Sequence, residues 1–422
     1  RLIHTVEIAD NQLLTERFFR ESGLASDFGS NSRLGIYVHV PFCPHICPYC
    51  DFVKTARFNR KDVESYFVAL EKQFDTLVED VPADLQTATL YLGGGTPSLF
   101  PASYYKLLVD KIRSRFELEE FTIETNPFTN VAGAFRQWAE LGVTRITLGA
   151  QSLDDEVLKY LGRKHTREDV IANLGSALDA GIKDVQVDLI FGLKAGFAGR
   201  NIGSEISQLA QKGATGVSCY LLTIEKSTAF LNEQSATDED AILEYQQVCD
   251  ASSAAGFVQF ETSNFSRRPA IHNRLYWYGL PYLGLGTGAH GLLPPDIGHP
   301  FGRRYQVGIL PSRTSAGDDN LSFKKDNEKL FQVEFSHDVR SRNDVVQELL
   351  LTLLRTKEGV PLRWLESVFP EEVLAAFWKE PRIERACREQ LILKSDSHLL
   401  LSPGEKIRGD SWALLVSSVL LG

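Results

Sequence analysis

Three cysteines in one short segment are the residues of this chain best suited to chemistry. Cys43, Cys47 and Cys50 have the spacing C-x3-C-x2-C and directly follow a β-branched stretch that predicts a strand. Three thiolates this close can hold three irons of a cubane iron–sulfur cluster and leave the fourth iron without a protein ligand. An open metal position is what a site needs when a small molecule must bind the metal and react there. The segment therefore predicts an open [4Fe–4S] site.

A zinc site and a disulfide are the alternatives to this interpretation. His39 or His45 could supply a fourth zinc ligand, but no second C-x2-C pair occurs to close a tetrahedral site. Six cysteines in 422 residues are few, and the composition is typical of a cytosolic enzyme, which argues against disulfides. The other three cysteines fit no ligand pattern and are predicted to be structural: Cys219, Cys249 and Cys387.

The elements that must position these cysteines alternate between strands and helices. Strands are predicted at 36–40, 88–92, 121–124, 145–148, 184–190, 217–222 and 257–261. Amphipathic helices are predicted at 63–78, 104–116, 131–141, 167–180 and 238–255. This order predicts an α/β fold with a parallel sheet, either open or curved into a complete or partial barrel. In such barrels the loops at the carboxyl ends of the strands build the active site.

The loops after the first five strands all carry unusual residues. The second strand leads into Gly93-Gly94-Gly95-Thr96-Pro97-Ser98, where successive glycines allow a ligand to approach the backbone closely. Glu124, Gln151 and Asp188 stand at the ends of the next strands, and Arg163 could clamp a carboxylate. Taken singly, the glycines could be a tight turn and the polar residues ordinary surface groups. Together they predict a pocket for a ligand with a nucleoside end and an amino-acid end, beside the iron–sulfur cluster. S-adenosylmethionine (SAM) fits this description, since its amine and carboxylate can chelate the open iron and one electron can then break a carbon–sulfur bond.

These motifs resemble the radical SAM superfamily, in its oxygen-independent coproporphyrinogen III oxidase-like branch. The resemblance also covers Glu124-Thr-Asn-Pro127, Gly149-Ala-Gln-Ser-Leu-Asp154 and Tyr282-Leu-Gly-Leu-Gly-Thr-Gly-Ala-His290, and it runs from about residue 36 to the C-terminus. It implies that Cys43, Cys47 and Cys50 bind a [4Fe–4S] cluster. It implies a SAM pocket lined by Tyr37, Gly94, Gly95, Thr96, Glu124, Gln151, Arg163, Asp188 and Leu222. It also implies a partial (β/α)6 TIM-type barrel with a smaller helical, winged-helix-like C-terminal domain that contains a hairpin near residues 391–401.

Two details of the resemblance favour the HemW-type haem chaperones within this branch. True coproporphyrinogen oxidases of the branch have a further cysteine two residues after the third cluster ligand, where this chain has Phe52. HemW-type proteins carry an H-N-x-x-Y-W motif, which here places His272, Tyr276 and Trp277 as candidate haem contacts. A neutral imidazole is a common ligand of haem iron, although a histidine beside two aromatics can equally serve the core. His290 is a second candidate. Two departures are Lys194, where the family usually has proline, and a short connection at 266–271.

Four regions are predicted: an extension at 1–33, the radical SAM barrel at 34–300, an irregular linker at 301–343 and a C-terminal domain at 344–422. The net charge of −10 argues against a nucleic-acid partner, and no apolar run is long enough to span a membrane, so a cytoplasmic protein is predicted. The resemblance implies haem or another tetrapyrrole as ligand, a one-electron donor such as flavodoxin or ferredoxin, and haem-acceptor proteins. Three hypotheses remain open: a haem carrier, a radical SAM oxidoreductase or methyltransferase that acts on a tetrapyrrole (oxidising coproporphyrinogen III or degrading haem), and a redox-sensing iron–sulfur protein.

Overall fold

A six-stranded parallel sheet forms the centre of the fold. The computed structural model describes residues 33–127, 133–194, 197, 199–296, 298–308, 330–336 and 339–422. Each of the first five strands pairs in parallel with the next strand along the chain, so that six strands form one parallel sheet and the predicted βα architecture is confirmed. These strands are β1 (Arg33–Val40), β2 (Thr87–Gly94), β3 (Glu117–Thr125), β4 (Arg145–Gln151), β5 (Asp184–Phe191) and β6 (Gly216–Leu221). Their apolar side chains are largely buried on both faces, as expected for strands covered by helices.

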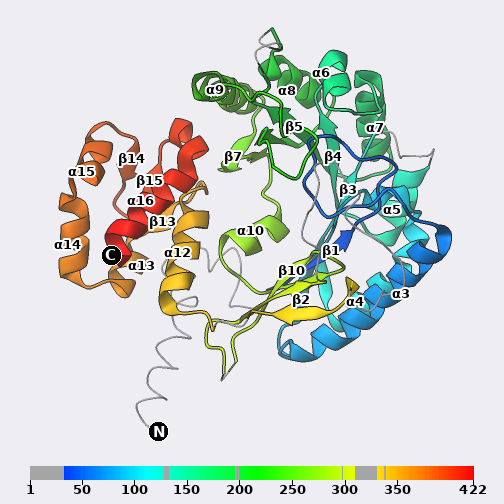
Figure 1. Ribbon diagram of the computed structural model, residues 1–422, viewed down its shortest axis with the longest axis horizontal. Helices are drawn as coiled ribbons and strands as arrows, with labels where there is room; N and C mark the ends of the chain where they lie inside the picture. Colours follow the sequence, from blue (N-terminus) through cyan, green and yellow to red (C-terminus); the bar gives the residue numbers. More distant parts are fainter. Residues whose placement is uncertain are drawn as a thin grey trace.

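Helices cover the outer face of this sheet (Figure 1). They are α3 (Arg60–Leu77), α4 (Lys106–Arg115), α5 (Ala134–Leu141), α6 (Asp155–Tyr160), α7 (Arg167–Asp179), α8 (Ile202–Gln211) and α9 (Asp238–Ala254). Short 3-10 turns lie at Val78–Asp80, Pro97–Leu99 and Ala102–Tyr104. The start of α3 is fixed by a capping box, in which Asn59 and Asp62 satisfy each other's backbone N–H groups. Thr166 and Asp169 form the same arrangement at the start of α7.

Further strands extend the sheet at both edges without closing it. β9 (Tyr282–Leu285) pairs in parallel with β1, and β10 (His290–Leu293), β11 (Arg303–Val307) and β12 (Val333–Phe335) follow in antiparallel order. At the other edge β8 (Asn264–Ser266) pairs with β6, and β7 (Val258–Glu261) pairs with β8. The twelve-stranded order therefore ends at β12 and β7, which is a partial barrel. Because β11 and β12 belong to this sheet, the prediction of an irregular linker at 301–343 is wrong for their residues.

The C-terminal part is a small helical unit with a three-stranded sheet. Its helices are α12 (Arg342–Leu353), α13 (Leu362–Val368), α14 (Glu371–Lys379), α15 (Pro381–Arg388) and α16 (Gly409–Leu421), with a 3-10 turn at Pro403–Arg408. Its strands are β13 (Val360–Pro361), β14 (Ile392–Lys394) and β15 (His398–Leu401). The β14–β15 pair is the hairpin predicted near 391–401.

The helix α10 (Ile271–Trp277) joins this unit to the barrel, and it lies between the two in Figure 1. Leu275 of α10 and the following Tyr278 share one hydrophobic core with Leu349 of α12 and Trp364 of α13. The C-terminal unit thus packs directly against the barrel.

The extension at 1–33 lies outside the described residues except for Arg33, which begins β1. Within the described residues, no helix has the length and apolar character needed to cross a membrane.

Candidate cofactor site

The three cysteines of the C-x3-C-x2-C segment line one cavity at the carboxyl ends of the parallel strands. This cavity has a volume of about 430 Å3 and is called the cysteine cavity below. The loop that carries the thiols is closed at its base, where the Cys43 N–H donates to the Thr55 carbonyl over 2.9 Å and the Thr55 N–H donates to the Pro41 carbonyl over 2.8 Å. The Lys54 ammonium donates to the Cys50 carbonyl from inside the loop, at 2.8 Å. All three thiols are free of disulfides.

The environments of these thiols differ. Burial raises the pKa of Cys43 to about 12, although the Thr96 hydroxyl donates to its Sγ at 3.7 Å. Burial also opposes ionisation of Cys47, but the His45 ring at 3.7 Å and the Arg163 guanidinium at 3.4 Å together lower its pKa to about 7. A thiolate is the form of cysteine that binds metals. Cys47 is therefore the thiol best prepared to bind a metal near neutral pH.

No three His, Cys, Asp or Glu side chains among the described residues converge as they would around one metal ion. An iron–sulfur cubane is wider than a single ion, and its thiolate ligands stand around separate irons. Cluster binding by the three cysteines stays a prediction at this point.

The glycine loop at the end of β2 lines the cysteine cavity. Gly94 has φ = +112°, a conformation that favours glycine, and its N–H donates to Glu124 Oε2 over 3.0 Å. The Gly95 N–H donates to the Val40 carbonyl over 2.8 Å, which ties the loop to the end of β1. A Cβ at Gly95 would lie 2.8 Å from the Pro41 carbonyl carbon, so only glycine fits there. The loop is thus held close to the segment that carries the cysteines.

Two partly buried carboxyl groups, those of Glu124 and Asp188, line this cavity. Glu124, at the end of β3, accepts a hydrogen bond from the Tyr91 hydroxyl over 2.9 Å, and burial raises its pKa. Burial, and then the charge of Glu124, raise the pKa of Asp188 on β5 to about 8. Among the described residues, the buried Oδ1 atom of Asp188 has no hydrogen-bond partner. A ligand hydroxyl or ammonium group in the cavity would satisfy this oxygen. SAM carries groups of both kinds.

Gln151 and Arg163 close the side of the cavity formed by β4. Gln151 has φ = +73° at a bulge where β4 shifts its register against β5, and such strained residues concentrate at ligand sites. Arg163 donates to the Gly149 carbonyl over 2.7 Å, to Asn126 Oδ1 and to the Cys47 thiol. Arg163 therefore links the ends of β3 and β4 to the cysteine loop.

Eight of the nine residues predicted to line the SAM pocket do border the cysteine cavity: Gly94, Gly95, Thr96, Glu124, Gln151, Arg163, Asp188 and Leu222. Tyr37 is the exception, because it borders a neighbouring cavity of about 560 Å3. This second space is called the tyrosine cavity, after the four tyrosines in its wall: Tyr37, Tyr91, Tyr276 and Tyr282. Asp51, Phe52 and Glu124 border both cavities, so the two are direct neighbours.

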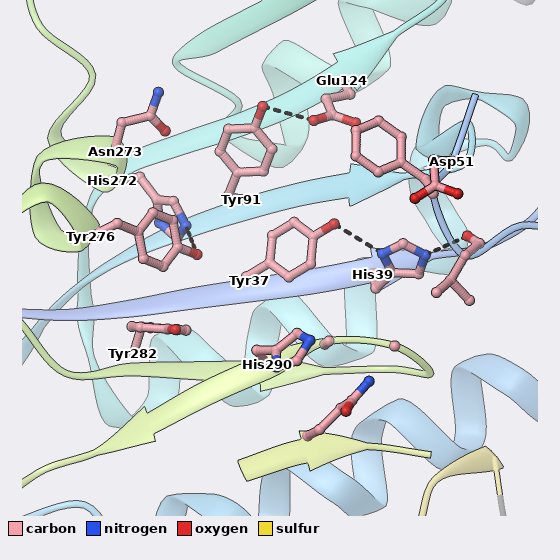
Figure 2. A pocket seen from close by; sticks show the side chains of 15 residues that line it. Tyr37, His39, Asp51, Tyr91, Glu124, His272, Asn273, Tyr276, Tyr282 and His290 are labelled. Carbon is pink, nitrogen blue, oxygen red and sulfur yellow. Dashed lines mark hydrogen bonds between the residues drawn. The ribbon is translucent and has the colours of Figure 1, made fainter. Parts of the chain in front are cut away.

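The predicted haem residues are divided between two environments. His272 and Tyr276 border the tyrosine cavity, and the His272 Nε2 lies 2.8 Å from the Tyr276 hydroxyl (Figure 2). Trp277 instead packs against the hydrophobic core of the C-terminal unit. His290, the second candidate, borders the tyrosine cavity.

Several residues of the tyrosine cavity were not predicted from the sequence. Tyr91 could have been found, because it alternates along β2 with Thr89 and Gly93 on one face of the strand. Tyr282 begins a family motif but was given no role, and Gln306 had no signal, since the short strands β9 and β11 that carry them were not predicted.

Comparison with known proteins defines the class of this fold and site. Residues 37–195 match the family model of the radical SAM superfamily. The solved structure of coproporphyrinogen III oxidase (HemN) from Escherichia coli, a radical SAM enzyme, aligns with a TM-score of 0.69 over 92% of this chain and 90% of the oxidase, at 16% identity. That likeness supports the fold alone.

Several relatives of similar sequence are HemW proteins, which form one group within this superfamily. Heme chaperone HemW of Bacillus subtilis is 29% identical over 89% of this chain and 96% of the relative. HemW of Lactococcus lactis is 30% identical over 79% of this chain and 84% of the relative, and HemW of Escherichia coli is 34% identical over 61% and 70%. The chain belongs to the radical SAM superfamily, in the coproporphyrinogen III oxidase-like branch that includes the HemW proteins.

Proposed function

We propose that this chain is a haem-binding radical SAM protein that passes haem to acceptor proteins. Membership of the superfamily implies a [4Fe–4S] cluster and SAM, and the HemW relatives suggest haem. The observation that carries the proposal is the contact between two cavities, since Asp51, Phe52 and Glu124 border both. A cofactor in the cysteine cavity would therefore adjoin a ligand in the tyrosine cavity.

Cys43, Cys47 and Cys50 would hold the cluster in the cysteine cavity. Three observations support this: the three cysteines line one cavity, they form no disulfides, and the pKa of Cys47 is lowered to about 7. The bound cluster and SAM supply one-electron cleavage of a carbon–sulfur bond. A small electron-transfer protein such as flavodoxin or ferredoxin would deliver that electron.

The SAM subsite would use the groups that the cysteine cavity presents. The unpartnered oxygen of Asp188 and the strained Gln151 would bind polar groups of the ligand, and the backbone of Gly94 to Thr96 would pack against it. Arg163, beside Cys47, would place positive charge near the carboxylate of SAM. Leu222 would supply apolar surface.

The tyrosine cavity would hold the tetrapyrrole. Its volume of about 560 Å3 falls within the range of small-molecule sites, and aromatic rings dominate its wall. His272 and Tyr276 would contact the macrocycle there. Trp277, which packs into the C-terminal core, would act on the haem only through the position of α10.

A radical SAM oxidoreductase or methyltransferase that acts on a tetrapyrrole is the second candidate function. Phe52 bears on this choice, because it is 65% exposed and borders both cavities at the position where the oxidases of the branch have a cysteine. A phenyl ring offers no thiol for a hydrogen or metal transfer step. An enzyme activity is supported by the eight predicted SAM residues and the three cysteines that border the cysteine cavity.

A binding experiment on the anaerobically reconstituted protein tests the proposal. We expect saturable binding of both haem and SAM, and little protoporphyrinogen IX when coproporphyrinogen III, SAM and a reductant are added. Arg163→Ala should weaken SAM binding roughly tenfold or more in calorimetry, because a charged partner is lost. Arg136→Ala, which removes an exposed arginine from α5, is the matched control. Absence of haem binding would refute the carrier function. Robust conversion of coproporphyrinogen III would instead support the enzyme function.

A further inference from the structure

Three histidines border the tyrosine cavity, and they differ in what their rings contact. They are His39 on β1, His272 on α10 and His290 on β10. A neutral imidazole has one nitrogen that donates a hydrogen bond and one that accepts it. A ring nitrogen can bind a metal without breaking a contact only if it takes part in no hydrogen bond. The hydrogen bonds of each ring therefore decide which histidine is ready to be a ligand.

His39 and His272 have both ring nitrogens in hydrogen bonds. The His39 ring lies 3.0 Å from the Tyr37 hydroxyl at Nδ1 and 2.7 Å from the Val53 carbonyl at Nε2. The His272 ring lies 2.7 Å from Thr89 Oγ1 at Nδ1 and 2.8 Å from the Tyr276 hydroxyl at Nε2, and this residue is 1% exposed. Metal binding by either ring would leave a buried hydroxyl or carbonyl unpaired, which is costly.

His290 differs from these two histidines in its hydrogen bonds. Within the part of the chain that the structure describes, its ring takes part in no hydrogen bond, and the residue is exposed. Figure 2 shows dashed lines from His39 and His272 to their partners, and none from His290. Partial burial of the ring, and then the charge of Arg304, lower the pKa of His290 from its ordinary value, which favours the neutral ring.

The backbone around His290 fixes the direction of its ring. In the β10–β11 pair His290 stands opposite Gln306, which also borders the tyrosine cavity. Gly291, the next residue, faces the other way, because a Cβ there would lie 2.1 Å from the Tyr305 ring. Gly288 has φ = +83° and leaves no room for a Cβ, which would lie 2.5 Å from Val53. The glycine-rich turn thus brings the strand close to the cysteine loop and directs His290 into the cavity.

We propose that His290 supplies the imidazole ligand to the iron of the bound haem, whereas His272 positions the Tyr276 hydroxyl. This inference rests on the proposed function and assigns the metal contact within it. Iron held by a histidine is a common form of haem binding, and the bond forms without proton or electron transfer when the imidazole is already neutral.

Resonance Raman spectroscopy of the reduced haem complex tests this assignment, because the iron–imidazole stretching band appears only when histidine binds the iron. The band should be present in the wild type and in His272→Ala, and absent in His290→Ala and His290→Gln. Added free imidazole should restore it in His290→Ala. His398→Ala, in the distant β14–β15 hairpin, is the matched control.

Metal-free protoporphyrin IX separates this inference from the proposed function. His290→Ala should bind hemin more weakly than the wild type, but protoporphyrin IX equally well, because that ring has no iron to bind. A wild type without the band, a band that persists in His290→Ala, or a band that is lost only in His272→Ala would overturn the assignment. If the wild type binds neither hemin nor protoporphyrin IX, the proposed function itself fails.

Discussion

Burial governs what each histidine of the site can do. His39 and His272 lie inside the barrel, and burial lowers their pKa values to about 4 and about 3. Both rings are therefore neutral hydrogen-bonding groups, and their positions depend on the tyrosines beside them. His290 is exposed, and its ring takes part in no hydrogen bond among the described residues, so it is better suited to bind a ligand. The sequence could not make this distinction, because it shows three histidines and not their contacts.

The depressed pKa of His272 predicts acid sensitivity of the fold. Below about pH 6.5 the unfolded chain takes up a proton at this residue, whereas the folded chain does not until about pH 3. Protons therefore favour the unfolded state. As the pH falls from about 6.5 to about 3, the free energy of unfolding should decrease by up to about 1.4 kcal/mol per pH unit.

Urea unfolding of the cluster-free protein at several pH values measures this slope. His272→Gln should be less stable at pH 7, because its hydrogen bonds are imperfectly replaced, but its stability should change less between pH 6.5 and 4.5. His398→Gln, in a partly exposed hairpin, should keep the slope of the wild type. An unchanged slope in His272→Gln would show that this histidine is protonated in the folded state.

At the scale of elements, the glycine loop after β2 positions the cysteine segment. Gly95→Ala places a methyl group 2.8 Å from the Pro41 carbonyl carbon and 2.9 Å from the Phe42 carbonyl oxygen. Both are backbone atoms, so the clash can be relieved only by moving the chain that leads into Cys43. We expect a loss of roughly 1–3 kcal/mol in the free energy of unfolding, together with weaker SAM binding.

Gly175→Ala is the control for this variant. Gly175 lies within α7, and a Cβ there meets no atom within 4 Å. This substitution should stabilise the protein by about 0.5–1 kcal/mol, because alanine favours the helix. Wild-type stability and SAM affinity in Gly95→Ala would contradict the proposed role of the loop.

Much of the barrel could be predicted from periodicity, since long apolar strands alternate with amphipathic helices. β1 to β6 were found for this reason, and the glycine loop and polar strand ends indicated the cysteine cavity. β9 to β12 are three to five residues long and lack clear alternation, so their part in the sheet was missed. The tyrosine cavity depends on these strands, which explains why only part of its wall was predicted.

At the scale of the whole molecule, an ion pair ties the C-terminal unit to the barrel. Arg355, which follows α12, contacts Glu261 of β7 at 2.8 Å and Asp410 of α16 at 3.0 Å. The Glu261 side chain is only 4% exposed, so its carboxylate depends on this partner and on the Ser263 and Asn264 N–H donors. Arg355 follows α12, which contacts α10, and residues of α10 also line the tyrosine cavity.

Arg355→Ala should therefore destabilise the protein by roughly 1–3 kcal/mol, because a buried carboxylate loses its charged partner. Thermal unfolding measures the effect. Glu261→Gln in the same chain should recover part of the loss by removing the unpaired charge. Arg382→Ala, which breaks an exposed pair with Glu380, should change stability by less than about 1 kcal/mol. Equal effects of Arg355→Ala and Arg382→Ala would contradict a structural role for the junction.

Mössbauer spectroscopy of anaerobically purified, 57Fe-labelled protein tests the central claim most directly. A [4Fe–4S] cluster held by Cys43, Cys47 and Cys50 should show one iron site that differs from the other three and whose signal changes when SAM is added. Absence of a cluster, or four irons that do not respond to SAM, would contradict the account.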